Sequence, residues 1–208
     1  MNAGVPFRQH LQEFLETVEK SSALVPSLEG AAEVLCRCLR SGNKVLACGN
    51  GGSACDAMHL VEELVGKYSR PRRGLPAICL NADPSVLTCI ANDWDYQTVF
   101  ARQVEALGAR GDFLVIFSSS GNSENLLRAL QVAKAEGLHT LSMLGRGGGR
   151  AKGLAEHELI VPSDNTARIQ EMHTWFLHEL LEAVEHELFP AEDSERKPCA
   201  SKVIFARP

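Results

Sequence analysis

Concentrated positive charge, long apolar runs and paired cysteines are all missing from this sequence of 208 residues. Its 21 Lys and Arg are outnumbered by 26 Asp and Glu, which gives a formal net charge of −5, and the basic residues form no long run. Tight binding to a nucleic-acid backbone depends on clustered positive charge. We therefore expect no direct nucleic-acid partner.

Apolar residues are interrupted throughout the chain. No stretch approaches the roughly eighteen uninterrupted apolar residues that predict a membrane-spanning helix. The first residues, MNAGVPFRQHLQEFLE, contain no apolar core of a secretory signal. The sequence thus predicts neither membrane insertion nor secretion.

The cysteines form no CxxC pair. Most of the 7 cysteines lie in apolar stretches such as VLACG and AICLN, as reduced core thiols do. They are Cys36, Cys38, Cys48, Cys55, Cys79, Cys89 and Cys199. This usage favours a reducing, cytoplasmic compartment and argues against zinc-finger spacing.

Short apolar segments alternate with helical patterns along the chain, whose composition is 45% hydrophobic and 23% charged. The expected strands are 44–48, 76–80, 113–118, 139–144 and 157–162. The expected helices are 7–22, 27–39, 53–68, 85–107 with a break, 123–136 and 166–188. This alternation predicts an α/β fold with helices on both faces of a parallel sheet.

The two ends of the chain differ in pattern. The first expected helix carries one apolar stripe, formed by Leu11, Phe14, Leu15 and Val18, which needs a partner surface. Residues 190–208 mix charges and prolines without a period, so we expect a mobile tail there. The remaining residues, 1–189, are expected to form a single domain.

A glycine-rich loop follows the first expected strand. Gly49-Asn50-Gly51-Gly52-Ser53-Ala54 fits the dinucleotide pattern G-x-G-x-x-A, which also requires an acidic residue about twenty positions later. Here Asp83 lies about thirty positions past the loop, so the dinucleotide interpretation is disfavoured. No lysine follows the glycines, and a P-loop is unsupported. A phosphate-binding loop and a simple tight turn both remain open.

A second polar loop, SSSGNSEN at 118–125, follows the third expected strand. Its hydroxyl and amide groups are neutral donors, and they precede a helix whose free amides attract anions. The structural alternative is a polar turn in which Ser123 caps the helix. Both loops are therefore candidates for binding a phosphate group.

The helix after the glycine loop offers a metal-ligand pair. His59 and Glu63 are four residues apart and therefore share a helix face, although a surface ion pair has the same spacing. The last expected helix adds Gln170 and His178, eight residues or roughly 12 Å apart along the axis. For the other histidines of that helix, His173 and His186, structural roles are expected.

Four segments occur in an order and spacing that resemble a known family. They are CGNGGSACDAMHLVEEL at 48–64, AND at 91–93, SSSGNS at 118–123 and RIQEMHTWFLH at 168–178. Together they resemble the sugar isomerase (SIS) family and, within it, the phosphoheptose isomerases. The resemblance extends from the N-terminal helices to about Leu188 and excludes the tail.

The resemblance implies a flavodoxin-like, five-stranded parallel sheet, N-terminal helices for oligomerisation, and a homotetramer with active sites at subunit interfaces. It implies one Zn²⁺ per site, with ligands His59, Glu63, Gln170 and His178. The implied substrate-binding residues are Asn50, Gly51, Gly52, Asn92, Asp93, Ser118, Ser119, Ser120, Ser123 and Gln170.

The implied reaction converts sedoheptulose 7-phosphate to D-glycero-D-manno-heptose 7-phosphate through an enediol. Such a product would supply lipopolysaccharide or another heptose-containing glycan. Glu63 and His178 are the expected acid–base pair. A zinc ligand is a weaker base, so either one ligand loosens, or polarisation dominates and Asp93 or a water handles the proton.

The sequence also departs from the family pattern and leaves alternatives. Lys67 stands where we expect an arginine, so a bidentate contact there is in doubt. The same family includes a non-catalytic tetramer that binds the bacterial replication initiator. That relative lacks the ligands that His59, Glu63 and His178 provide here. A different phosphosugar isomerase or a phosphosugar-sensing domain is a third possibility.

Overall fold

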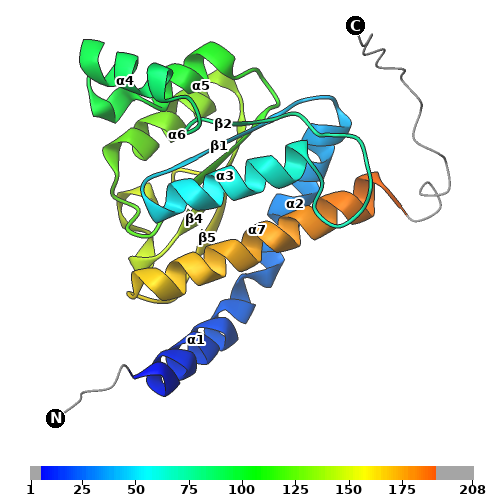
Figure 1. Ribbon diagram of the computed structural model, residues 1–208, viewed down its shortest axis with the longest axis vertical. Helices are drawn as coiled ribbons and strands as arrows, with labels where there is room; N and C mark the ends of the chain where they lie inside the picture. The colour runs from blue at the N-terminus through cyan, green and yellow to red at the C-terminus, as the bar shows by residue number, and fades with distance from the viewer. Residues whose placement is uncertain (1–5, 191–208) are drawn as a thin grey trace, which may run out of the picture.

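A central parallel sheet organises the computed structural model, which describes residues 6–190 (Figure 1). Its strands are β1 (Val45–Gly49), β2 (Ala77–Cys79), β3 (Phe113–Ser118), β4 (His139–Leu144) and β5 (His157–Ile160). The strand order is β2-β1-β3-β4-β5, and every pairing is parallel. The predicted five-stranded α/β fold is thus confirmed.

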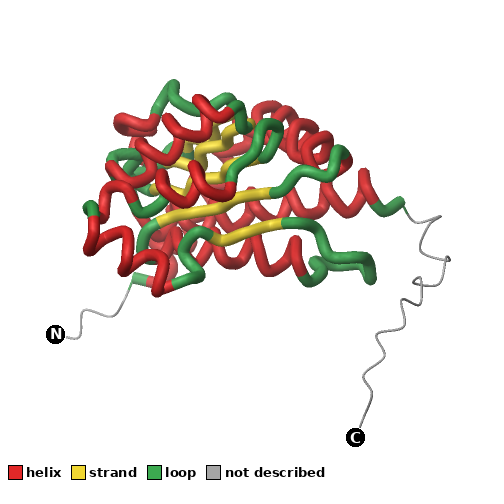
Figure 2. Tube along the Cα trace, turned by 90° about the horizontal axis from the view of Figure 1, so that it is seen from above, coloured by secondary structure: helices red, strands yellow, loops and turns green. Residues whose placement is uncertain are grey.

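Helices cover both faces of the sheet, as the view from above shows (Figure 2). The helices are α1 (Phe7–Ser21), α2 (Val25–Arg40), α3 (Gly52–Val65), α4 (Pro84–Asp93), α5 (Ala101–Leu107), α6 (Glu124–Glu136) and α7 (Thr166–Leu188). Short 3-10 turns are η1 (Ser22–Leu24), η2 (Tyr96–Thr98) and η3 (Arg146–Ala151).

Each face of the sheet has its own core. Residues of α2, α3 and α7 pack with Val45, Ala47, Val115 and neighbouring side chains on one face. Residues of α4, α5 and α6 pack on the other face. All residues of β1 and β3 are buried, as expected for central strands of a parallel sheet. The sheet therefore holds the loops that follow β1 and β3 rigidly.

The helix boundaries differ from the predicted ones most at two places, and elsewhere by at most two residues. The helix expected over 53–68 ends at Val65, because Gly66 leaves the helical conformation. The segment expected over 85–107 divides into α4 and α5, and the break contains η2. The last helix matches its predicted bounds, 166–188.

The first helix projects from the body of the molecule (Figure 1). Phe14 packs against the core, whereas Phe7, Leu11, Leu15 and Val18 are 74%, 58%, 53% and 41% exposed. Most of the apolar stripe therefore has no partner within residues 6–190.

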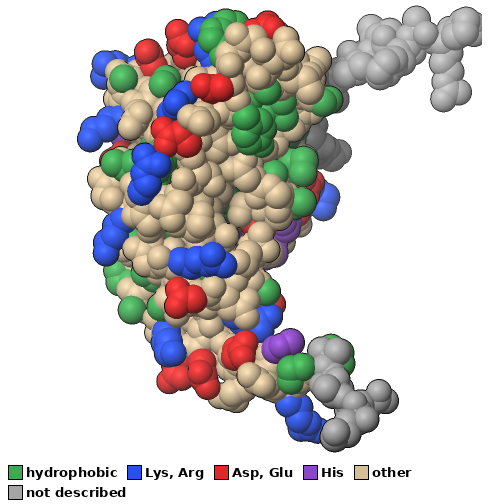
Figure 3. Space-filling model, turned by 90° about the vertical axis from the view of Figure 1, so that its left-hand side faces the viewer, with side chains coloured by type: hydrophobic (Ala, Val, Ile, Leu, Met, Phe, Trp, Pro, Cys, Tyr) green, Lys and Arg blue, Asp and Glu red, His purple; other side chains and the backbone are tan. Residues whose placement is uncertain are grey.

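On the face shown in Figure 3, acidic and basic side chains are interspersed. Among residues 6–190, no helix combines the length and the apolar character that crossing a membrane requires. Apart from Pro190, the tail predicted over 190–208 lies outside the described residues.

Candidate active site

The order of the strands brings the two polar loops together. In a parallel sheet with order β2-β1-β3-β4-β5, the chain leaves β1 and β3 in opposite directions across the sheet. Ligands bind beyond the carboxyl ends of the strands at such a switch point. The glycine loop (residues 49–54) follows β1, and the serine-rich polar loop at 118–125, called the serine loop below, follows β3. Both therefore lie where this fold binds ligands.

The glycine loop gives α3 a start that only small residues allow. Gly51 has φ 58°, in the left-handed region that favours glycine, and precedes the first residue of the helix. A Cβ at Gly52 would collide with the side-chain amide of Gln170. The absence of a side chain at Gly52 therefore lets α7 approach the beginning of α3.

A reciprocal pair of amides links the two loops. The Asn50 Nδ2 donates to Asn125 Oδ1 at 3.0 Å, and Asn125 Nδ2 donates back to Asn50 Oδ1 at 3.0 Å. The Tyr96 hydroxyl also donates to Asn50 Oδ1 at 3.2 Å. Asn125 is only 3% exposed. The side chain of Asn50 is thus held by protein groups, and its backbone amide is the more available donor.

The serine loop keeps part of its hydrogen-bonding capacity free. Ser118 Oγ accepts from the Gly121 amide at 3.1 Å, and Ser120 Oγ accepts from the Asn122 amide at 3.3 Å. Ser123 occupies the N-cap position of α6 without a side-chain capping bond. The structural alternative, in which the Ser123 hydroxyl caps the helix, is therefore not observed. In the described part of the chain, the Ser119 and Ser123 hydroxyls have no hydrogen-bond partner.

The predicted residues Asn92 and Asp93 lie at the exposed end of α4. Asn92 Nδ2 donates to Asp93 Oδ1 at 2.8 Å, and the Cys89 thiol donates to Asp93 Oδ2 at 3.5 Å. Tyr96, a few residues later, connects this part of the chain to Asn50. Among the described residues, no side-chain hydrogen bond joins Asp93 to either loop.

Helices α3 and α7 lie side by side (Figure 1) and contact each other at three successive levels, one helical turn apart. Gly52 faces Gln170, and in the next turn the Thr174 hydroxyl donates to Asp56 Oδ1 at 3.2 Å. One turn further, the rings of His59 and His178 pack edge to face with centroids 5.0 Å apart. The helices therefore run parallel, in a register that brings the predicted ligands of both helices together.

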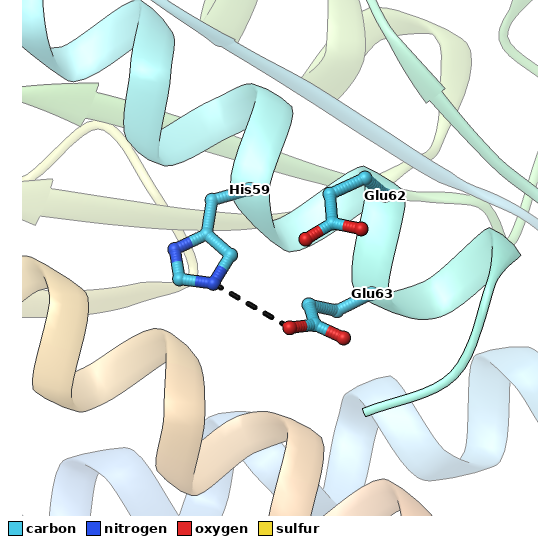
Figure 4. Close-up of side chains that lie close together, drawn as sticks. All are labelled: His59, Glu62 and Glu63. Atoms are coloured by element: carbon cyan, nitrogen blue, oxygen red, sulfur yellow. Dashed lines mark ion pairs between the residues drawn. The ribbon is translucent and has the colours of Figure 1, made fainter. Parts of the chain in front are cut away.

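An imidazole–carboxylate cluster forms at the third level of contact, where His59 meets His178. His59 Nε2 lies 3.6 Å from Glu63 Oε1, and the two side chains are 33% and 19% exposed. Ligand atoms of His59, Glu62 and Glu63 all lie within 4.8 Å of one another, and Figure 4 shows the three side chains facing the same space. Glu62 was not among the predicted ligands. The cluster thus combines side chains of the types that ligate divalent cations.

Gln170 lies at the first level of contact, near the start of α3. Its amide contacts Gly52, two helical turns before His178, so the spacing problem expected from the sequence persists within one chain. The side chain of His178 instead contacts His59 and, at 5.6 Å between centroids, the ring of Tyr68. A role for Gln170 as a fourth ligand stays a prediction.

The carboxylate of Asp56 is buried between α3 and α7, at the second level of contact. It is 8% exposed, and its Oδ2 has no hydrogen-bond partner among the described residues. Burial raises the pKa of Asp56 to about 6, against the smaller opposing effects of the Thr174 hydroxyl and His59. Sequence pattern alone does not mark Asp56 as buried, because the pattern of α3 does not reveal which helix covers it.

The other histidines of α7 have structural positions. His173 is fully buried, its Nε2 lies 3.2 Å from the Leu144 carbonyl oxygen, and burial lowers its pKa to about 4. His186 is exposed near the end of the helix. Neither residue belongs to the cluster of His59 and Glu63.

The fold and this arrangement define the class of protein. Residues 6–145 match the family described as the SIS domain. Strands β1 to β4 and both polar loops fall within the matched region, whereas β5 and α7 follow it. The chain is thus a SIS-domain protein.

Comparisons with individual proteins identify the family more narrowly. A phosphoheptose isomerase of Helicobacter pylori is 51% identical over 178 residues, which cover 84% of this chain and 93% of that protein. One of Fusobacterium nucleatum is 44% identical over 180 residues, covering 86% and 90%. The solved structure of a Francisella tularensis phosphoheptose isomerase matches with TM-score 0.84 and 34% identity, covering 86% and 96%. The chain belongs to the phosphoheptose isomerase family.

Proposed function

We propose that this protein is an isomerase that converts sedoheptulose 7-phosphate to D-glycero-D-manno-heptose 7-phosphate. The observation that carries the proposal is the meeting of His59, Glu63 and His178 at the contact of α3 with α7. Helix α3 starts in the glycine loop, so the same element connects this cluster to a candidate phosphate site. The family relationship supports the heptose phosphate as substrate.

The isomerisation requires a proton to move between C1 and C2 of the sugar through an enediol. A carboxylate and an imidazole placed beside the reacting carbons can accept and return that proton. Glu63 and His178 supply these groups from different helices, with the His59 ring between them. We assign the acid–base roles to Glu63 and His178, of which the one that accepts the proton would have to be released from any bound ion, because a coordinated lone pair is not free to act as a base.

His59, Glu63 and the neighbouring His178 are residue types that suit a zinc ion. Two imidazoles and a carboxylate are typical ligands of Zn²⁺, and an amide oxygen is acceptable to a borderline divalent ion. His59, Glu63 and His178 would hold the ion, with Gln170 as the remaining predicted ligand. When bound, Zn²⁺ would stabilise negative charge on the sugar oxygens at C1 and C2.

The phosphate group would bind at the loops after β1 and β3. The free hydroxyls of Ser119 and Ser123 and the amides at the start of α6 are suitable donors to an anion. The backbone amides of Gly51 and Gly52 add donors from the other loop. Binding energy from the phosphate would position the reactive end of the sugar.

An oligomer would cover the apolar surface that one chain leaves open. The exposed stripe of α1 and the exposed ring of Trp175 on α7 are suitable contact surfaces. We propose a homotetramer with active sites at its interfaces. A cytoplasmic location is part of the proposal, and the six described cysteines are free thiols.

Turnover of sedoheptulose 7-phosphate by the purified protein, with analysis of its metal content, tests the proposal. We expect isomerisation, its loss on chelation, and its recovery with Zn²⁺. Activity confined to another ketose phosphate would redirect the assignment to a different phosphosugar isomerase. Zinc-free protein without turnover would contradict it. Binding of the replication initiator is not favoured, because the curated relatives described above are phosphoheptose isomerases.

A further inference from the structure

The buried carboxylate of Glu185, near the C-terminal end of α7, accepts hydrogen bonds from four groups. Glu185 is 1% exposed, and it accepts hydrogen bonds from the backbone amides of Tyr68, Ser69 and Arg70 at 3.2, 3.1 and 2.9 Å. Arg72 Nε donates to Glu185 Oε1 at 2.7 Å, and the Arg72 side chain is fully buried. Burial alone would raise the pKa of Glu185, but these donors outweigh it and the pKa lies below its ordinary value.

The guanidinium of Arg72 also binds the end of α3. Its Nη2 donates to the backbone carbonyl of Glu63 at 2.7 Å, and its Nη1 donates to the carbonyl of Leu64 at 3.0 Å. These carbonyls belong to the last turn of the helix, where no intrahelical donor is available. Arg72 therefore joins Glu185 directly to the residue whose side chain faces His59.

The same carboxylate holds the other side of the site. The amide of Tyr68 is one of its donors, and the ring of Tyr68 packs on His178 at 5.6 Å between centroids. Glu185 follows His178 by about two helical turns on α7. A chain of contacts therefore connects Glu63 to Arg72, Arg72 to Glu185, Glu185 to Tyr68 and Tyr68 to His178.

We propose that the buried Arg72–Glu185 ion pair is a positioning device that sets the relative placement of Glu63 and His178. This inference rests on the proposed function for its catalytic meaning. A guanidinium is required because its planar fork reaches the carboxylate and two carbonyls at once, which a single ammonium cannot do. Removing the pair would loosen the end of α3 and the segment that carries Tyr68.

Glu185→Gln tests the proposal, because it keeps the size of the side chain and removes its charge. Cobalt(II), a spectroscopic probe for zinc sites, is titrated into the metal-free protein. We expect cobalt affinity to fall about 10-fold or more, the usual effect of losing a group that orients metal ligands, with an altered visible spectrum. The kcat should fall while KM for the heptose phosphate changes little, because the phosphate loops are untouched.

Glu187→Gln is the matched control. Glu187 lies on the same helix and pairs with Arg40 at 2.7 Å, but both side chains are 53% exposed. An exposed pair contributes little to structure. This variant is expected to keep the parent's cobalt affinity, spectrum and kcat.

Arg72→Lys is the second variant, in case Glu185→Gln does not fold. It keeps the buried positive charge and is expected to change cobalt affinity and spectrum in the same direction. A folded Glu185→Gln or Arg72→Lys protein with the parent's affinity, spectrum and kcat would overturn the proposal, whatever its melting temperature.

A readout without metal separates this inference from the proposed function. Nuclear Overhauser contacts between labelled tyrosine and histidine rings report the packing of Tyr68 on His178 in the metal-free protein. We expect this contact to be lost in Glu185→Gln and kept in Glu187→Gln, and an unchanged contact counts against the positioning role. If the parent protein neither binds cobalt nor turns over substrate, the proposed function fails. The contact between the Tyr68 and His178 rings then tests the positioning role by itself.

Discussion

The loops after β1 and β3 and the contact between α3 and α7 use different chemistry. Residues 49–54 of the glycine loop and residues 118–123 of the serine loop, ahead of Glu124 at the start of α6, contain no acidic or basic side chain. The helix contact gathers charged and titratable groups, among them Asp56, His59, Glu63 and His178. Neutral donors suit an anion that carries its own charge, whereas proton transfer and metal binding need titratable groups.

The two regions are also positioned differently. Each loop is fixed by the buried strand before it and the helix after it, and the Asn50–Asn125 amide pair joins them. The cluster depends on the register of two helices that are far apart in the sequence. We therefore expect changes in the cluster to lower kcat and changes in the loops to raise KM.

Glu63→Gln and His178→Gln should have the largest effect. Each is expected to leave a folded oligomer whose kcat is lower by at least about 10²-fold, the scale for a positioned acid–base group. Steady-state kinetics and circular dichroism measure the two properties. Glu105→Gln is the matched control, since Glu105 is a 58% exposed glutamate on α5, away from the α3–α7 contact. Near-parental kcat in either principal variant would remove that residue from the mechanism.

A double substitution in the serine loop should act mainly on binding. Ser119→Ala with Ser120→Ala is expected to raise KM by about 10-fold with little change in kcat, because hydrogen bonds to a charged phosphate are lost. Ser41→Ala, at the end of α2 and before β1, is the control at the opposite end of the sheet. An unchanged KM in the double variant would move the phosphate site away from this loop.

Asp56→Asn should have the smallest effect, and on stability. The pKa of Asp56 is raised from 3.8 to about 6, so the proton it binds in the folded state stabilises the protein below about pH 4. That contribution is lost as the pH rises through 6. The variant has no charge to bury and should therefore gain about 1 kcal/mol in free energy of unfolding at pH 7 to 8, and nothing below pH 4.

Denaturant unfolding of the metal-free protein at both pH values measures this difference. Asp83→Asn is a control of opposite sign, because the Ser85 hydroxyl and the Val86 amide lower the pKa of the exposed Asp83. It should lose a little stability at neutral pH, where the carboxylate is charged. Equal stability of the parent and Asp56→Asn at pH 7 to 8 would show that the buried carboxylate is better solvated than its contacts indicate.

Much of the fold was accessible from hydrophobic pattern alone. The strands at 113–118 and 139–144 and the helix at 166–188 occur at the predicted residues. The end of α3 was misplaced, because the pattern of apolar residues continues past Val65 while Glu185 draws the following amides out of the helix. A carboxylate more than a hundred residues away leaves no local signal.

The site was predicted in part. Sequence spacing identified the His59–Glu63 pair, and the last helix offered His178, to which the resemblance assigned a ligand role; the structure places His178 beside His59. Nothing in the sequence pointed to Asp56, Asn125 or Glu62. These residues acquire their surroundings only when separate elements pack together. The roles of Gln170, Asn92 and Asp93 remain predictions.

By itself the sequence determined the alternation of strands and helices, the two neutral loops and the spacing of His59 and Glu63, because each depends on neighbouring residues. Tertiary structure alone decided which groups became neighbours across the α3–α7 contact and which charges were buried there. The physical reason is that burial and hydrogen bonding depend on what covers a side chain, and in this protein that cover comes from distant parts of the chain.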